Sequence, residues 1–209
     1  MNPTQLEVAA ALLDVGAVAL TPDKPITFKS GIVAPIYVDN RTLPYHPAAW
    51  RVAIAGLEKL VDAESLDFDV IAGIETGGIP HSAALAYRMG RPSVFVRKQP
   101  KEHGTKRRVE GGGVAGKRVL LIEDTITTGG SSLSGVAALR DEGANVVACL
   151  VIFSYGFPQA VDAFAEVGVP LTALTTLETV IAAAQRRGDM TADAIRIVQE
   201  WSERIVRPS

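Results

Sequence analysis

The stretch of sequence that decides the fold reads Val119-Leu120-Leu121-Ile122-Glu123-Asp124-Thr125-Ile126-Thr127-Thr128-Gly129-Gly130-Ser131-Ser132. Its four leading aliphatic residues suit a central parallel strand that is buried on both faces. Apolar residues resume at helical spacing directly afterwards, beginning with Leu133. The polar turn therefore lies where a strand ends and a helix begins, and there the unpaired helix N–H groups favour an anion. Its glycines and small hydroxyls predict a sugar-phosphate site, and the adjacent carboxylates suit ribose hydroxyls or magnesium.

Strand and helix patterns alternate along most of the chain. In order, the sequence predicts helix 47–63, strand 69–73, helix 78–89, strand 93–97, strand 118–123, helix 131–142, strand 145–153, strand 170–174 and helices 177–187 and 191–206. Alternating βα units indicate a parallel sheet with helices on both faces. We therefore expect an α/β fold whose loops at 74–78, 98–117, 124–130 and 154–158 meet at one edge of the sheet, where ligands bind.

The N-terminal region has a different pattern. Thr4-Gln5-Leu6-Glu7 has the form of a capping box and predicts a first helix that ends at Gly16. The segment Pro22–Arg41 contains prolines and the alternating run Ile36-Tyr37-Val38, which indicates a hairpin or a small appended sheet.

Composition sets limits on what the protein does. The chain has 209 residues, 47% of them hydrophobic and 21% charged, so it can form a full core. The net charge of −2 predicts no general attraction to nucleic acid or to an anionic membrane. The single cysteine, Cys149, lies in an apolar run and cannot form an internal disulfide, which fits a reducing compartment. No stretch suits a membrane span or a signal peptide, so we expect a cytoplasmic protein.

A second glycine turn follows the strand predicted at 69–73 and reads Glu75-Thr76-Gly77-Gly78. This turn also precedes a predicted helix, so it is another candidate anion site. The alternative is a tight turn whose glycines only allow close packing of strand and helix.

A basic segment, Arg97 to Arg108, follows the next strand, and seven of its twelve residues are Arg, Lys or His. Its length and the glycines after it suggest a lid, although a solvated surface loop has the same composition. The run Gly111 to Lys117 has most of a P-loop motif. We reject that interpretation because Arg118 replaces the required Ser or Thr and because the run precedes a strand.

These motifs resemble those of type I phosphoribosyltransferases. The acid pair followed by Thr-x-Thr-x-Gly-Gly resembles the signature for phosphoribosyl pyrophosphate (PRPP), and Arg-Lys-x-x-Lys-x-His-Gly resembles the catalytic loop of the orotate phosphoribosyltransferase family. The segment Phe28 to Arg41, with its Lys-Ser-Gly, resembles the hood of that family. The resemblance covers residues 4 to 155. It implies a twisted, mainly parallel sheet flanked by helices and a single domain, 1–209, with a hood at 1–45, a core at 46–175 and C-terminal helices at 176–209.

The resemblance also implies roles for individual residues. Catalysis is assigned to Lys101, Asp124 and Glu123. Magnesium is the expected cofactor; it arrives with PRPP, and Asp124 or Glu123 can orient it directly or through water. PRPP binding is assigned to Lys29, Glu75, Thr76, Gly77, Arg97, Lys98, Lys101, His103, Glu123, Asp124, Thr125, Ile126, Thr127, Thr128, Gly129, Gly130 and Ser131.

Orotate binding is assigned to Thr127, Tyr37 and Lys29. Other family members place an arginine after the last core strand to meet the orotate carboxylate, whereas this chain has Ile152-Phe153-Ser154-Tyr155-Gly156. Backbone N–H groups, Thr127, Lys29 or Arg41 would then meet that carboxylate.

The implied reaction is transfer of the phosphoribosyl group from PRPP to orotate in pyrimidine biosynthesis. The implied assembly is a homodimer in which the basic loop reaches the neighbouring active site. Two alternatives stay open: a phosphoribosyltransferase for another base, and a PRPP-binding regulator that binds nucleic acid. The Lys-Ser-Gly hood argues against the first, and the net negative charge argues against the second.

Overall fold

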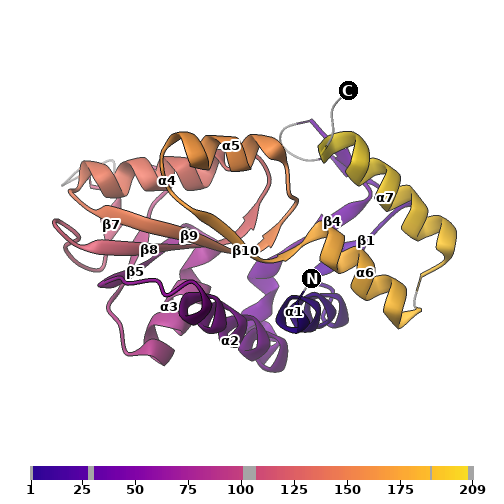
Figure 1. Cartoon of the computed structure of the whole chain (residues 1–209), viewed down its shortest axis with the longest axis horizontal. Coiled ribbons are helices and arrows are strands. Elements are labelled where there is room, and N and C mark those ends of the chain that lie inside the picture. The colour runs from indigo at the N-terminus through magenta and orange to yellow at the C-terminus, as the bar shows by residue number, and fades with distance from the viewer. Residues whose placement is uncertain (1, 28–30, 101–106, 189, 207–209) are drawn as a thin grey trace.

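The computed structural model describes residues 2–27, 31–100, 107–188 and 190–206. Within these residues, one sheet of six strands forms the middle layer, in the order β10-β9-β8-β5-β6-β7 (Figure 1). The strands of this sheet are β5 (Val70–Ile74), β6 (Ser93–Val96), β7 (Val109–Glu110), β8 (Arg118–Ile126), β9 (Asn145–Ser154) and β10 (Leu171–Thr176). All neighbouring strands pair in parallel except β7, which is antiparallel to β6. The α/β fold with a mainly parallel sheet is therefore confirmed.

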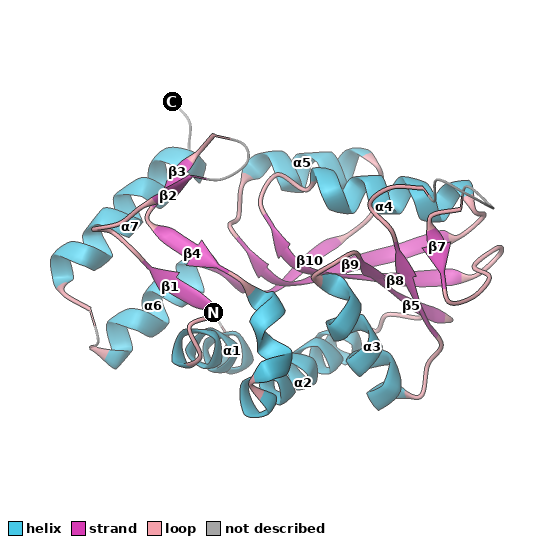
Figure 2. Ribbon diagram, turned by 180° about the vertical axis from the view of Figure 1, so that it is seen from behind, coloured by secondary structure: helices cyan, strands magenta, loops and turns pink. Residues whose placement is uncertain are grey.

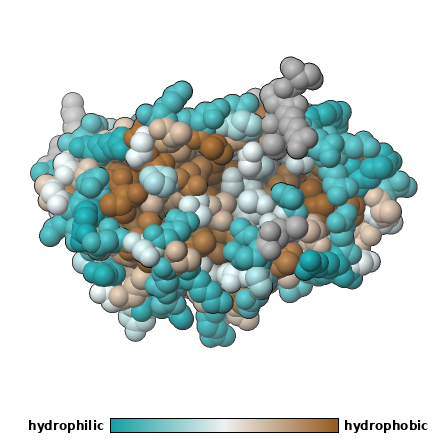
Figure 3. Space-filling model, viewed as in Figure 1, coloured by the Kyte–Doolittle hydropathy of each residue, from teal (hydrophilic) through white to brown (hydrophobic). Residues whose placement is uncertain are grey.

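Helices cover both faces of the sheet (Figures 1 and 2). The helices are α1 (Pro3–Asp14), α2 (Pro47–Ala63), α3 (Gly78–Met89), α4 (Gly130–Asp141), α5 (Pro158–Glu166), α6 (Leu177–Arg187) and α7 (Ala192–Val206), with a short 3-10 helix η1 (Asn40–Tyr45). α4 and α5 lie on one face, and α1, α2 and α3 lie on the other. Because both faces are covered, β5 is buried along its whole length and the aliphatic part of β8 is buried too. On the face in Figure 3, apolar residues gather in the middle and hydrophilic residues form the outline.

The N-terminal region forms two small antiparallel sheets among its described residues. β1 (Val18–Leu20) pairs with β4 (Ile36–Val38), and β2 (Ile26–Thr27) pairs with β3 (Val33–Ala34). Both sheets lie at the end of the molecule where α6 and α7 lie (Figure 2). The indole Nε1 of Trp201 in α7 donates a hydrogen bond of 2.7 Å to the carbonyl oxygen of Val33. The predicted appended sheet is present, and it packs against the C-terminal helices.

Three local predictions were incomplete or wrong. The capping box of α1 is formed by Asn2 and Gln5, not by Thr4 and Glu7, because Pro3 already takes the first helical position. The antiparallel strand β7 lies inside the stretch predicted as a loop, and the helix α5 was missed. The run Gly111 to Lys117 lies between β7 and β8 and precedes a strand, as expected for a segment that is not a P-loop.

In the part of the chain that the structure describes, no helix has both the length and the apolar character needed to cross a membrane. Cys149 is fully buried in β9, and its burial raises the pKa of the thiol well above its ordinary value. A buried thiol with a raised pKa is expected to be unreactive, so Cys149 is a residue of the core.

Candidate active site

A cavity of about 230 Å³ lies at the carboxyl ends of the strands β5, β6 and β8. The hood contributes to it through the last residue of β4 and the residues that follow. The described residues that line it are Val38, Asp39, Arg41, Glu75, Thr76, Gly77, Lys98, Glu123, Asp124, Thr125 and Ser131. Both glycine turns and the start of the basic segment therefore contribute to one cavity, as the sequence predicted.

The two turns are in direct contact. Gly77 has no room for a side chain, because a Cβ atom there would collide with the carboxyl group of Asp124. A Cβ atom at Gly78 would lie 2.5 Å from the carbonyl oxygen of Ile122 in β8. The peptide bond between Glu75 and Thr76 is cis. The glycines at 77 and 78 thus allow the turn to pack closely against β8, as the alternative interpretation of this turn proposed. The same close packing places the turn at the wall of the cavity.

Two helices begin at this cavity. α3 follows Gly77 and α4 follows Gly129, and neither helix has a side chain that caps its first turn. Gly129 has a φ of 82°, a left-handed conformation that favours glycine. Uncapped N–H groups and the positive ends of both helix dipoles are therefore available to anions at two points of one site.

The acid pair differs in exposure and in hydrogen bonding. Glu123 is only 4% exposed; its Oε2 accepts a hydrogen bond of 3.0 Å from the Ser132 hydroxyl, and its Oε1 accepts one of 3.1 Å from the Asp124 N–H. Burial raises the pKa of Glu123 well above its ordinary value, and repulsion from Asp124 adds to the shift. Burial also raises the pKa of Asp124. Asp124 is the more accessible of the two acids, so it is the better placed to bind hydroxyl groups.

Replacing Glu123 by glutamine should stabilise the ligand-free protein at neutral pH. When the pKa of a carboxyl is higher in the folded state than in the unfolded state, the protein loses folding free energy as the pH rises from the unfolded-state pKa to the folded-state pKa. Glutamine does not titrate, so the variant does not have this loss. The melting temperature of Glu123→Gln should therefore exceed that of the wild type by roughly 2–4 °C for each kcal/mol gained, and the gap should close in acid. Thermal unfolding across pH measures this. Glu64→Gln, at an exposed position, is the control; equal melting temperatures at every pH would contradict the prediction.

The predicted phosphate turn contributes unevenly to the cavity. Thr125 and Ser131 line it, whereas Ile126 is 1% exposed and belongs to the core, so only the backbone of Ile126 is available to a ligand. Thr127, Thr128 and Gly129 lie in the turn before α4, Gly130 is the first residue of α4, and none of the four lines the cavity wall.

The predicted cations are separated in space. Lys98 lines the cavity, and its N–H donates a hydrogen bond of 2.8 Å to Oε2 of Glu75. The guanidinium of Arg97 lies 3.7 Å from the carboxylate of Glu110 in β7, outside the cavity lining. Lys29, Lys101 and His103 lie outside the described residues.

The hood supplies an ion pair at the cavity wall, and Tyr37, which is not among the residues that line the cavity, adjoins this pair. Tyr37 is 41% exposed, and its hydroxyl donates a hydrogen bond of 3.2 Å to Oδ2 of Asp39. The Arg41 guanidinium donates to both carboxylate oxygens of Asp39, at 2.6 and 2.8 Å. This hydrogen bonding to Arg41 lowers the pKa of Asp39. Arg41, which was weighed for the orotate carboxylate, thus lines the cavity with a cation.

The described residues contain no group of three or more His, Cys, Asp or Glu side chains that could hold a metal ion. Carboxylates are nevertheless the ligands that magnesium prefers, and magnesium is usually bound by one or two of them together with substrate phosphates. Asp124 and Glu123 supply such a pair, so the site fits a magnesium ion whose other ligands come with a pyrophosphate group.

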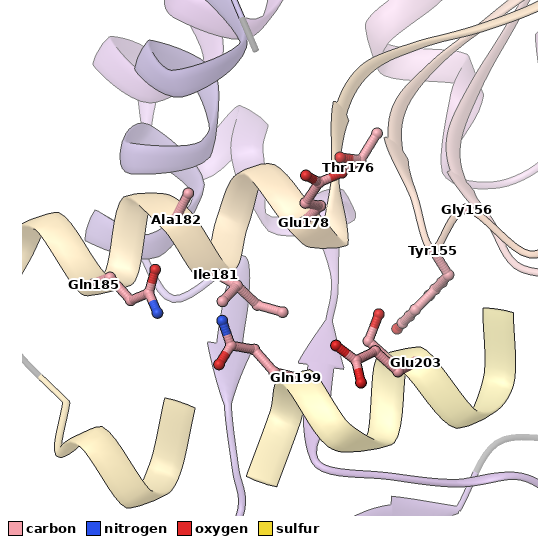
Figure 4. A pocket seen from close by; sticks show the side chains of 10 residues that line it. Tyr155, Gly156, Thr176, Glu178, Ile181, Ala182, Gln185, Gln199 and Glu203 are labelled. Atoms are coloured by element: carbon pink, nitrogen blue, oxygen red, sulfur yellow. The ribbon is translucent and has the colours of Figure 1, made fainter. Parts of the chain in front are cut away.

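A further cavity of about 590 Å³ lies between the Tyr155–Gly156 turn, α6 and α7 (Figure 4). Tyr155 points toward α7, and Glu178 and Glu203 lie at the wall. Among the described residues, its lining contains these two glutamates and no lysine or arginine, so it does not suit a carboxylate. Of the loops expected to meet, the one at 154–158 therefore contributes to this cavity and not to the cavity of the acid pair.

Sequence reasoning missed Ser132, Asp39 and Asn40. Ser132 holds Glu123, and Asp39 lines the cavity. Asn40 is fully buried behind the site. Ser132 continues the Gly-Gly-Ser-Ser run and could have been included on that basis. His81 is fully buried and accepts a hydrogen bond of 3.0 Å from Nε1 of Trp50.

The phosphoribosyl transferase domain family matches residues 43–172, and with the fold and the two glycine turns at one cavity this defines the class: a phosphoribosyltransferase. The orotate phosphoribosyltransferase of Streptococcus thermophilus (strain CNRZ 1066) is 41% identical over 197 residues, which cover 94% of each chain. The solved orotate phosphoribosyltransferase from Aeropyrum pernix matches with a TM-score of 0.75 and 30% identity, covering 88% of this chain and 99% of that one. The Mycobacterium tuberculosis H37Rv enzyme in complex with PRPP matches with a TM-score of 0.67 and 28% identity, covering 85% and 99%. The chain therefore belongs to the orotate phosphoribosyltransferase family.

Proposed function

We propose that this protein transfers the 5-phosphoribosyl group from PRPP to N1 of orotate, which gives orotidine 5'-monophosphate and pyrophosphate in de novo pyrimidine biosynthesis. One observation carries the proposal: two uncapped helix N-termini, after Gly77 and after Gly129, begin at one cavity that also contains an acid pair. A ligand with phosphate groups at both ends and a sugar between them fits this arrangement.

Each part of the site has a role in this reaction. Asp124 and Glu123 hold the ribose hydroxyls, and the segment from Thr125 to Ser131 binds the 5-phosphate, which positions the anomeric carbon against the base. The turn Glu75-Thr76-Gly77 binds pyrophosphate together with Lys29, Arg97, Lys98, Lys101 and His103. Negative charge accumulates on pyrophosphate as it leaves, so these cations stabilise the transition state more than the ground state. Bound magnesium would neutralise part of the pyrophosphate charge.

Orotate is proposed to lie against Tyr37 of the hood, with Thr127 and Lys29 as further contacts. The cation of Arg41 at the cavity wall supports a carboxylate near the hood. The lining of the further cavity, which carries Glu178 and Glu203, argues against a carboxylate near Tyr155.

We also propose that residues 1–209 work as one domain, with a hood, a core and C-terminal helices. A cytoplasmic homodimer, in which the basic segment reaches the neighbouring active site, fits the composition and the family. Neither nucleic acid nor a membrane is a proposed partner.

A panel of bases tests the activity. With PRPP and magnesium, the purified chain should release pyrophosphate and form a nucleotide with orotate but not with adenine, guanine or xanthine. A reaction without base measures background hydrolysis of PRPP. Turnover of a purine instead of orotate would favour the transferase for another base, and binding of PRPP without turnover of any base would favour the regulator.

A further inference from the structure

Asn40 lies directly behind the acid pair. It is the first residue of η1, follows the hood strand β4, and is fully buried, so it does not line the cavity itself. Its side-chain Nδ2 donates a hydrogen bond of 2.8 Å to the carbonyl oxygen of Asp124 and one of 3.1 Å to Oγ1 of Thr125. One amide group of the hood thus contacts two consecutive residues of the cavity wall, 84 and 85 positions later in the chain.

These contacts fix the orientation of the Asn40 amide. A backbone carbonyl only accepts hydrogen bonds, so the atom that faces Asp124 must be the NH₂ group. The oxygen Oδ1 has no hydrogen-bond partner among the described residues. Turning the amide over would place Oδ1 against the Asp124 carbonyl, would remove that hydrogen bond, and would make the Thr125 hydroxyl a donor to Oδ1.

The same geometry determines what the Thr125 hydroxyl can do. A hydroxyl group has one hydrogen to donate and two lone pairs that accept. Since Oγ1 accepts from Asn40, its own hydrogen points away from Nδ2 and is available to a ligand in the cavity that Thr125 lines. An anion such as a phosphate oxygen or a ribose oxygen can accept that hydrogen.

A neutral, buried side chain, that of His81, lies beside the backbone of Asn40. The imidazole of His81 lies against the Asn40 backbone, and Nδ1 of His81 accepts a hydrogen bond from Trp50. Burial lowers the pKa of His81 to about 4, although the backbone carbonyl of Asn40 opposes the shift. His81 is therefore neutral at physiological pH and places no charge behind the site.

We propose that Asn40 is a positioning residue: its side-chain amide holds the Asp124 backbone and orients the Thr125 hydroxyl as a hydrogen-bond donor to PRPP. Because Asn40 follows the strand that carries Tyr37, it also ties the hood to the sugar-phosphate turn. The inference rests on the proposed function.

A double-mutant cycle tests this proposal. Asn40→Ala and Thr125→Val should each raise the KM for PRPP by about tenfold, because Thr125→Val removes the donor to the ligand and Asn40→Ala removes the hydrogen bond that orients it. The KM for PRPP of the double variant should exceed that of the single variant with the higher KM by no more than about twofold, since both changes remove the same interaction. The KM for orotate should change less than the KM for PRPP. Thr42→Val, which removes an exposed hydrogen bond of the same 3-10 helix, should leave all constants unchanged.

Several outcomes would overturn the inference. An unchanged KM for PRPP in Asn40→Ala, or effects that multiply in the double variant, would show that Asn40 does not act through Thr125. A lower melting temperature with unchanged kinetic constants would show a purely structural role. If Asn40→Ala is too unstable to assay, Asn40→Asp keeps the side-chain volume and should raise the KM for PRPP as well, because a carboxylate accepts the hydroxyl hydrogen. A wild-type protein without orotate turnover would instead contradict the proposed function.

Discussion

Replacing Lys101 by alanine is expected to lower kcat by about two to three orders of magnitude and to leave the melting temperature unchanged. The residue lies outside the described part of the chain, and the family resemblance assigns it to pyrophosphate. A cation at the leaving group acts most strongly in the transition state, when the negative charge on pyrophosphate is largest. The expected loss is therefore in kcat more than in the KM for PRPP. Steady-state kinetics with varied PRPP and orotate measure both constants.

Lys117→Ala is the matched control for this lysine. Lys117 is exposed and precedes β8 at the opposite edge of the sheet from the cavity, so its loss should not change kcat. An unchanged kcat in Lys101→Ala would remove that residue from the proposed mechanism. A comparable loss in both variants would indicate that net charge, and not a specific contact, governs the rate.

Replacing Gly77 by alanine should lower kcat/KM for PRPP by about a hundredfold, because a misplacement of about 1 Å can have that effect on catalysis. The added methyl group would collide with the Asp124 carboxyl, so the turn or the acid must move. Either movement separates the turn proposed to bind pyrophosphate from the carboxyl group proposed to hold the ribose. Circular dichroism and thermal unfolding should show a folded protein, and PRPP kinetics should show the loss.

Gly113→Ala is the control for this substitution, because a Cβ atom at Gly113 meets no atom within 4 Å. It should keep the activity of the wild type. In a variant that already carries Asp124→Ala, adding Gly77→Ala should lower kcat/KM for PRPP only slightly further, since the carboxyl with which the methyl group collides is then absent. Full activity of Gly77→Ala would contradict the idea that the two turns must keep their contact.

Much of the core of the fold was predictable from local patterns. α2, α3 and the strand from Val119 into the acid pair follow apolar periodicity and glycine positions, which are local properties of the sequence. By contrast, β7 has two residues, Val109 and Glu110, and two residues show no periodicity. Its pairing with β6 depends on tertiary contacts and could not be predicted locally.

In the candidate site, too, some features follow from local sequence patterns and others depend on tertiary contacts. The turns at 75–78 and 124–131 were identified because glycines and hydroxyls follow buried strands. The contact of Asn40 with Thr125 joins segments 85 residues apart, and no local pattern indicates it. The different positions of Arg97 and Lys98 have a simple cause: consecutive residues of extended chain point to opposite sides, so only one of the two lines the cavity.

The pairing of β6 with β7 has a consequence for how the enzyme can change during evolution. The N–H of Arg97 donates a hydrogen bond of 2.9 Å to the carbonyl oxygen of Arg108, and the Arg108 guanidinium donates one of 2.8 Å to the carbonyl oxygen of Arg97. These two hydrogen bonds join the residue after β6 to the residue before β7. Insertions, deletions or substitutions between these two arginines need not disturb strand register, so rate and selectivity can evolve there while the free energy of folding stays nearly constant.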